Sequence, residues 1–489
     1  MGPSNASHLF YAVVLAIPLV FTGCGDTKPA DTKKAADKGA DKGADKVPDK
    51  VPDKPEPPPV DSSKTAERAF ANTSVPPPPD WKGPVFELSH DYPKERPTCS
   101  SPWLQREVKF EAGGTWDQWA PYIQDIVDYV KEGQDPNLAN EIGWRAKIET
   151  TGGEETRWFH VPWMAYDGHQ GREFVHGLTN ELSTARSTFT GRGGGLHTLP
   201  GAPPDALYET WSVGFYNPCG GWSIGQQWPA SGEPATYDEG GRMLARGMPF
   251  PEGTLVVKVL NTTANGDDVP YLKGSTNWQA DAHVQLGPDK YETCKRVVRE
   301  VHLVQIDLAV VDSRSPTRWV YSTLVYDGTM EGETIWDRMR PLGVQWGNDP
   351  GTFPAVPEGE SKPLSESIAA PINIHEHYGC QKRLAGNVDQ SNSSCLSCHM
   401  GAYAPAAGTA IEQGTNVPAI FTFDGMCTTN NAANANYFSN YLYPAPFPGS
   451  AGAVAAAMPL DTSLQLQVAF GEYAKFVAPP SNPSCPPAG

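Results

Sequence analysis

The sequence lacks both a long apolar run and an excess of basic residues. No stretch reaches the roughly 18 apolar residues that a membrane-spanning helix needs, and the apolar run at residues 9–21 holds only 13. Lys and Arg number 38 against 56 Asp and Glu, which gives a formal net charge of −18. Binding to a phosphate backbone needs a basic surface, so this composition argues against nucleic acid as the partner.

The N-terminus lacks Lys and Arg before Lys28, yet it still has the pattern of an export signal. The apolar run at 9–21 has the length of a signal-peptide core. Phe21-Thr22-Gly23-Cys24 resembles a bacterial lipobox, in which the cysteine is acylated and becomes the mature N-terminus, although Phe21 stands where leucine is more usual. We therefore predict that residues 1–24 are a lipoprotein signal peptide and that Cys24 is the lipidation site. The alternative is an ordinary secretory signal with an incidental Cys24.

Residues 25–80 have too few apolar side chains to form a core. Asp-Lys-Gly-Ala and Asp-Lys-Val-Pro repeat between residues 28 and 56, and proline runs follow at 57–59 and 76–79. Such a stretch cannot offset the entropy lost when its backbone is ordered. We expect a disordered tether that joins a membrane anchor at Cys24 to a folded part. The protein is then held at the cell envelope, facing the periplasm or the cell exterior.

The remaining chain predicts a mainly β protein. Gly and Pro, at 48 each, indicate many turns. One helix is expected at 121–132, with Pro121 in its first turn. β-Branched and aliphatic residues predict a strand at 254–260, and alternating apolar residues predict strands at 301–311 and 464–470. A further strand at 318–326 follows a short loop and is expected to form a hairpin with 301–311. We expect an antiparallel sheet or sandwich as the body, residues 81–365, with an irregular, partly helical segment, residues 366–489, packed on it.

The segment Cys395-Leu396-Ser397-Cys398-His399 has the spacing that c-type haem attachment requires. Two thiols three residues apart can each add to one haem vinyl group, and the adjacent imidazole then reaches the iron from the same face. With nine Cys and 11 His in 489 residues, this pattern is rare by chance. It predicts one covalent haem c, attached at Cys395 and Cys398, with His399 as an axial iron ligand.

Three other interpretations of the motif stay open. A zinc site needs a second ligand pair, which His375 and His377 of His375-Glu376-His377 could offer. A thioredoxin-like redox pair needs a βαβ context that the sequence pattern does not show. A structural disulfide is the third. Haem is favoured because its covalent attachment takes place outside the cytoplasm, where the signal peptide delivers the chain.

Six cysteines remain once Cys24 is assigned to lipid and two to haem. An oxidising compartment allows them up to three disulfides, with about 15 connectivities if all six pair. The alternative is that some are buried thiols. These residues are Cys99, Cys219, Cys294, Cys380, Cys427 and Cys485.

Four segments resemble a group of large bacterial proteins of the cytochrome c family. They are residues 211–218 (WSVGFYNP), 344–350 (VQWGNDP), 383–386 (RLAG) and 393–399 (SSCLSCH), and the similarity extends from about residue 100 to about residue 475. The resemblance implies covalent haem and no particular substrate. The chain does not resemble a small cytochrome c, in which the attachment motif lies near the start of a compact helical domain.

The second axial ligand of the iron is not determined by the motif. Met458 and Met426 lie downstream, and a thioether is a soft ligand suited to haem iron. His375 or His377 could also fold back, and an open site is the remaining option. Met400 adjoins His399, so it cannot readily reach the opposite haem face.

Three functions follow from these options. The first is electron transfer with an unidentified redox protein, favoured because no catalytic constellation is visible in the sequence. The second is a haem enzyme or sensor with an open iron site for peroxide or a diatomic gas. The third is a β-rich ligand-binding protein that carries a redox haem. The size of the body favours the latter two.

We predict that labelled palmitate is incorporated into the wild-type protein and not into Cys24→Ser, because acylation needs the Cys24 thiol. Membrane fractionation after expression in a bacterial host checks the consequence. The wild type should sediment with membranes, whereas the variant should be released. A variant that sediments like the wild type would contradict lipid anchoring at this residue.

Overall fold

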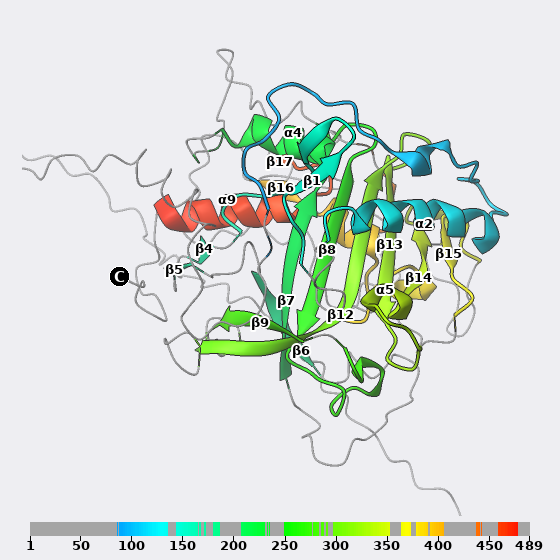
Figure 1. Ribbon diagram of the computed structural model, residues 1–489. Coiled ribbons are helices and arrows are strands. Elements are labelled where there is room, and N and C mark those ends of the chain that lie inside the picture. Colours follow the sequence, from blue (N-terminus) through cyan, green and yellow to red (C-terminus); the bar gives the residue numbers. More distant parts are fainter. Residues whose placement is uncertain are drawn as a thin grey trace, which may run out of the picture. The chain divides into compact units, whose positions relative to one another are not determined.

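A nine-stranded antiparallel sheet forms the centre of the chain (Figure 1). The structure is a computed structural model. It describes residues 86, 88–134, 143–164, 166–167, 171–172, 179–185, 207–229, 232, 234, 249–275, 277–282, 285–287, 290–291, 297–352, 363–372, 378–389, 392–404, 437–440, 442 and 458–477. All of them belong to one compact unit, residues 63–489.

The strand order of the main sheet is β15-β14-β13-β12-β8-β7-β3, and β6 pairs with β7 while β9 pairs with β12. The expectation of a mainly β, antiparallel protein is confirmed. The strands are β3 (Phe159–His160), β6 (Thr179–Ala185), β7 (Leu207–Tyr216), β8 (Leu255–Thr262), β9 (Asn277–Ala282), β12 (Val297–Val311), β13 (Trp319–Tyr326), β14 (Met339–Gln345) and β15 (Ser367–Ala369).

Four further pairs of short strands lie outside this sheet. They are β1 (Lys147–Thr150) with β2 (Gly153–Thr156), β4 (Tyr166–Asp167) with β5 (Gly171–Arg172), β10 (Gln285–Gly287) with β11 (Lys290–Tyr291), and β16 (Tyr403–Ala404) with β17 (Met458–Pro459). The last pair joins the chain that follows the Cys-x-x-Cys-His motif to the chain that precedes the last helix.

The predicted hairpin is present as β12 and β13, in which Gln305 pairs with Val325 and Val311 with Trp319. β12 begins earlier than expected, because its first half pairs with β9 and its second half with β8. Its side chains alternate between two apolar cores. Ile306, Leu308 and Val310 belong to one core, whereas Ala309 and Val311 belong to the other.

Helices cover both faces of the sheet, so the sandwich form of the prediction is not what the described residues show. α2 (Trp116–Lys131) packs on the first face, and α4 (Pro218–Gln227), α6 (Cys395–Met400) and α9 (Leu464–Val477) contribute to the core on the second. Successive strand residues point to opposite faces, so a strand that is apolar throughout needs both coverings. The short helices are α5 (Ile335–Arg338), η2 (Pro102–Gln105), η4 (Pro270–Leu272), η5 (Pro350–Thr352) and η6 (Cys380–Lys382).

The predicted helix near residue 121 is confirmed as α2, but the prediction of its start was wrong. Thr115 and Gln118 form a capping box, which begins the helix at Trp116 and places Pro121 inside it. Its buried face includes Trp119, whose ring stacks on that of Trp346 with 4.6 Å between centroids.

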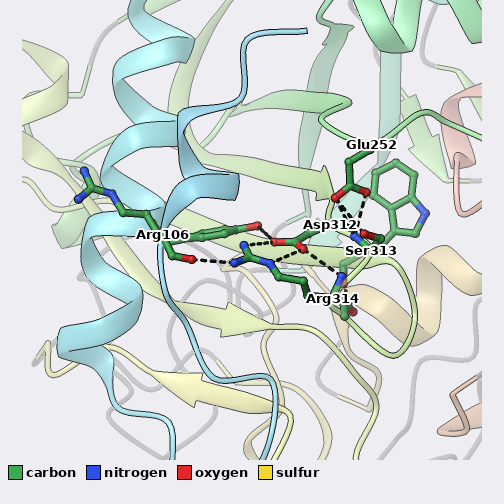
Figure 2. A network of polar contacts seen from close by, with 8 residues as sticks. Arg106, Glu252, Asp312, Ser313 and Arg314 are labelled. Carbon is green, nitrogen blue, oxygen red and sulfur yellow. Dashed lines mark hydrogen bonds and ion pairs between the residues drawn. The ribbon is translucent and has the colours of Figure 1, made fainter. Parts of the chain in front are cut away.

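A polar network joins α2 to the loop between β12 and β13 (Figure 2). The Asp312 carboxylate, fully buried, accepts hydrogen bonds from the Tyr122 hydroxyl at 3.0 Å and from Arg314 Nη2 at 2.7 Å. Glu252 accepts the backbone N–H of the next residue, Ser313, at 2.9 Å. The bonds to Asp312 satisfy a carboxylate that the fold has removed from water, whereas Glu252 and Ser313 are exposed.

The prediction of a strand at 464–470 was wrong, because this segment forms the first half of helix α9. The Ser463 hydroxyl caps the helix by accepting the Leu466 N–H at 3.2 Å. Leu466, Ala469 and Phe470 are buried, and Val468 is 39% exposed. These three buried residues are spaced i, i+3 and i+4, as residues on one face of a helix are. Leu466 and Phe470 alone are four residues apart, and that spacing fits both a strand and a helix.

One of the expected disulfides joins Cys99 to Cys219 at the start of α4. Cys380 is also disulfide-bonded. Cys294, Cys427 and Cys485 lie outside the described residues. Within the described part of the chain, no helix combines the length and apolar character needed to cross a membrane.

We predict that Gly221→Ala lowers the free energy of unfolding by about 1 kcal/mol. Helix propensity alone would predict the opposite, because alanine is more favourable than glycine in a helix by about 1 kcal/mol. A Cβ at Gly221 would lie 2.6 Å from the buried Phe159 ring, so α4 would be forced away from β3. Gly471→Ala in α9 is the control, because nothing lies within 4 Å of its Cβ position. Urea unfolding should show the second variant stabilised. Equal effects in both variants would contradict this packing.

Candidate haem-attachment site

The Cys-x-x-Cys-His motif forms the short helix α6, which the neighbouring chain fixes at its start. The Ser394 hydroxyl accepts the Ser397 N–H at 3.1 Å, as a helix N-cap does. The backbone N–H of Cys395 donates to the Leu384 carbonyl at 2.9 Å. Because α6 is helical, Cys395 and Cys398 lie on one face, one turn apart.

Asn348, in the turn after β14, organises the polar side of α6. Its Oδ1 accepts hydrogen bonds from Ser397 Oγ at 2.7 Å and Ser394 Oγ at 3.1 Å. Its Nδ2 lies 3.0 Å from the Met400 sulfur. Gln345 Oε1 also accepts a hydrogen bond from the Leu396 N–H at 3.3 Å. The motif is therefore fixed by side chains from the end of β14 and from the turn that follows it.

Arg383 holds the Asn348 turn in place. It is fully buried, and it donates to the Asn348 carbonyl at 2.9 Å and to Thr352 Oγ1 at 2.6 Å. Its guanidinium lies 4.6 Å from the centre of the Phe438 ring. Burial lowers the pKa of Arg383 to about 10, so the group stays charged at neutral pH. The segments 344–350, 383–386 and 393–399 therefore meet here.

The two motif cysteines are not disulfide-bonded. Cys395 Sγ lies 3.9 Å from Thr323 Oγ1 on β13. Burial, together with the carboxylates of Asp389 and Asp307, raises the pKa of the Cys395 thiol well above its usual range. A raised pKa is the opposite of what a thioredoxin-like nucleophile needs, and the antiparallel sheet is not a βαβ context. The geometry supports neither a redox pair nor a structural disulfide at this spacing.

The His399 imidazole is oriented from the far end of the chain. Its Nδ1 lies 3.0 Å from the Thr462 carbonyl oxygen, just before α9, and its ring centre lies 5.1 Å from that of Tyr321 on β13. A carbonyl can only accept, so Nδ1 carries the proton and Nε2 presents a lone pair. Fixing one ring nitrogen in this way prepares the other to bind a metal.

An open hollow of about 70 Å³ lies beside His399, between the sheet and α9. Cofactor sites typically have mostly apolar walls and a few polar groups. The lining fits a haem in character, since most of it is aliphatic or aromatic. It consists of Met164, Val256, Lys258, Asp307, Leu308, Ala309, Tyr321, His399, Leu464, Gln465 and Val468.

The structure brings together Cys395, Cys398 and His399 and leaves other predicted residues untested. Met458 is in β17, but its side chain is not among the features described, and Met426 lies outside the described residues. So do Cys24, His375 and His377. Among the residues that are described, no cluster of three His, Cys, Asp or Glu side chains could hold a metal ion by itself.

Sequence reasoning missed Met164, Asn348, Arg383 and Thr462. Met164 is a buried methionine on the loop after β3, and its side chain lines the same hollow as His399. Nothing local in the sequence distinguishes it from a core methionine. Asn348 and Arg383 lie in segments of the resemblance, so that pattern was the one available signal for them. In the comparisons with known proteins, the chain matches no family model, no curated protein and no solved structure.

Asp307 is the acidic residue in the wall of the hollow. It accepts hydrogen bonds from Thr323 Oγ1 at 2.9 Å and from Gln305 Nε2 at 3.1 Å. Burial raises the pKa of Asp307 to about 7, with the nearby Asp389 adding to the shift and Lys258 opposing it. Titratable groups with such raised pKa values are concentrated at functional sites in proteins.

We predict that Asp307→Asn makes the protein more stable than the wild type above pH 7. The pKa of an unfolded aspartate is about 3.9, so the folded wild type binds the extra proton between about pH 4 and pH 7. The stability that this proton contributes is complete below that window and lost as the pH rises through it. The urea midpoints of Asp307→Asn and the wild type should therefore move apart as the pH rises. The control is Asp267→Asn, at an exposed position, whose urea midpoint should change with pH as that of the wild type does. A constant difference at all pH values would contradict the shift.

Proposed function

We propose that this protein is a monohaem c-type cytochrome that transfers electrons at the cell envelope. The observation that carries the proposal is the arrangement of the motif. Cys395 and Cys398 lie one turn apart on α6, and the Thr462 carbonyl at 3.0 Å orients His399 so that Nε2 can bind iron. The Cys99–Cys219 disulfide supports export to an oxidising compartment, and anchoring at Cys24 would keep the protein at the membrane.

The residues of the site would each have a defined task. Cys395 and Cys398 would hold the haem by thioether bonds, and His399 Nε2 would bind the iron. Bound haem supplies a one-electron couple whose potential depends on axial ligands, hydrogen bonds and burial. The apolar walls from β8, β12 and α9 would exclude water from the ring. A redox protein, unidentified, would be the partner.

A methionine thioether in the hollow favours an electron carrier over an enzyme or sensor with an open iron site. Met164 lines the same hollow as His399, on the described part of the wall. Met458 and Met426, the ligands expected from the sequence, remain proposals beside it. A methionine as the second ligand gives a closed, high-potential carrier.

A second candidate is a haem enzyme or sensor with an open iron site. The observation that favours it is Asp307, a carboxyl in the wall of the hollow with a pKa raised to about 7. A group with such a pKa can give or take a proton near neutral pH, as general acid–base chemistry requires.

The test of covalent attachment is haem retention. After acid–acetone extraction, haem should stay with the polypeptide and give the c-type pyridine haemochrome spectrum, whereas Cys395→Ser/Cys398→Ser should release it. The Cys99→Ser/Cys219→Ser protein, which also loses two cysteines, should retain its haem. Haem that is extracted freely from the wild type would contradict the proposal.

Carbon monoxide added to the reduced, haem-loaded protein discriminates the two candidates. A carrier with a methionine ligand should not bind it, whereas an open site should bind it directly. Met164→Leu should admit carbon monoxide if Met164 is the ligand. The control is Met339→Leu, because Met339 is buried in the core on the other face of the sheet. Carbon monoxide binding to the wild type would favour the enzyme or sensor.

A further inference from the structure

The turn that meets His399 has an unusual backbone. Asp461 and Thr462 have φ values of 46° and 67°, in the left-handed region. Aspartate adopts this region more readily than most residues, but threonine rarely does. Thr462 is also β-branched, which makes this conformation less favourable still. Surrounding contacts must therefore hold Thr462 in this conformation. The outcome is that the Thr462 carbonyl oxygen lies 3.0 Å from His399 Nδ1.

The Asp461 carboxylate anchors this turn to the sheet. It is 4% exposed. Its Oδ2 accepts the Phe250 N–H at 2.7 Å, and its Oδ1 accepts the Trp319 indole N–H at 3.0 Å. Arg318 supplies the opposite charge, with Nη1 3.4 Å from Oδ2. The carboxylate thus has three partners, from the chain before β8 and from the start of β13.

The two residues after Asp461 are also bound to the sheet. The Tyr321 hydroxyl donates to Thr462 Oγ1 at 3.0 Å, and the Tyr216 hydroxyl lies 2.7 Å from Ser463 Oγ. Ser463 in turn caps α9, which forms one wall of the hollow. The turn at 461–463 therefore connects two strands, β7 and β13, with helix α9 and the imidazole of the motif.

The bond from Nδ1 to a carbonyl changes how His399 would act as a ligand. It restrains the rotation of the ring, and it raises the basicity of the other nitrogen, Nε2. A more basic axial ligand stabilises the oxidised iron, so this hydrogen bond would lower the reduction potential.

We propose that Asp461 is a positioning residue that sets the haem potential: its carboxylate fixes the 461–463 turn, and the Thr462 carbonyl thereby holds the His399 imidazole. This inference rests on the proposed function, because it needs a haem iron at Nε2. Asp461 itself touches neither thiol nor imidazole, and it acts only through the backbone of the residue that follows it.

The test is Asp461→Asn in the full chain, with haem content and midpoint potential measured together. The expected result is unchanged covalent haem and a potential raised by up to about 59 mV, the equivalent of a tenfold change in the equilibrium of a one-electron couple. The ring N–H resonance of His399, observed by NMR, should also exchange faster with water. Trp319→Phe removes only one of the three donors, so it should cause a smaller shift of the same sign, even if Asp461→Asn folds poorly.

Glu209→Gln is the matched control. Glu209 is also a carboxylate that is 4% exposed, and it accepts the Trp211 indole N–H at 3.1 Å and Arg299 Nη1 at 2.7 Å. Gly214 on β7 pairs with Lys258, which lines the hollow. Glu209 lies five residues before Gly214 on the same strand, which places it about 16 Å away along the strand. This variant should lose stability in a similar way and keep the wild-type potential.

The possible results separate the two proposals. A wild type without covalent haem would overturn the proposed function. A haem-loaded Asp461→Asn or Trp319→Phe whose potential and His399 resonance match those of Glu209→Gln would overturn the role of Asp461 and leave the cytochrome proposal standing.

Discussion

The two central strands, β12 and β13, are apolar on both faces, and neither face can be left to water. Ile306 and Leu308 point to the core that α2 covers, whereas Val311 and Tyr321 point to the second core. Burying a large apolar side chain contributes roughly 1.5–3 kcal/mol, so each face needs its own layer. Helix α4 and the C-terminal part of the chain supply the second layer. This requirement brings α6 and α9 onto the sheet and places the motif beside the hollow.

The same docking removes polar groups from water, and those groups need partners. A buried donor or acceptor without a partner costs about 1–3 kcal/mol. Asn348 bonds to the two serines of the motif segment, and Arg383 bonds to the carbonyl of Asn348. The pairs are specific in geometry as well as favourable in energy. They give α6 one position relative to β14, although a helix of six residues would not be stable alone.

Secondary structure was predictable where a segment had one dominant period. The hairpin of β12 and β13 follows from two β-branched, apolar runs with a short loop, and it is present. The strand expected at 464–470 failed because Leu466 and Phe470 are four residues apart, a spacing common to both periods. The start of α2 was misplaced because Pro121 was taken as a boundary, whereas the capping box of Thr115 and Gln118 sets it.

The sequence by itself determined the chemistry that the protein can carry. The identities and spacing of Cys395, Cys398 and His399 are local facts, and the attachment chemistry they predict depends on that spacing alone. Only the tertiary structure decided which groups surround them. Thr462 is 63 residues from His399, and Met164 is more than 200 residues away. Contacts at such separations depend on how the two faces of the sheet are covered, and no local pattern in the chain encodes that pairing.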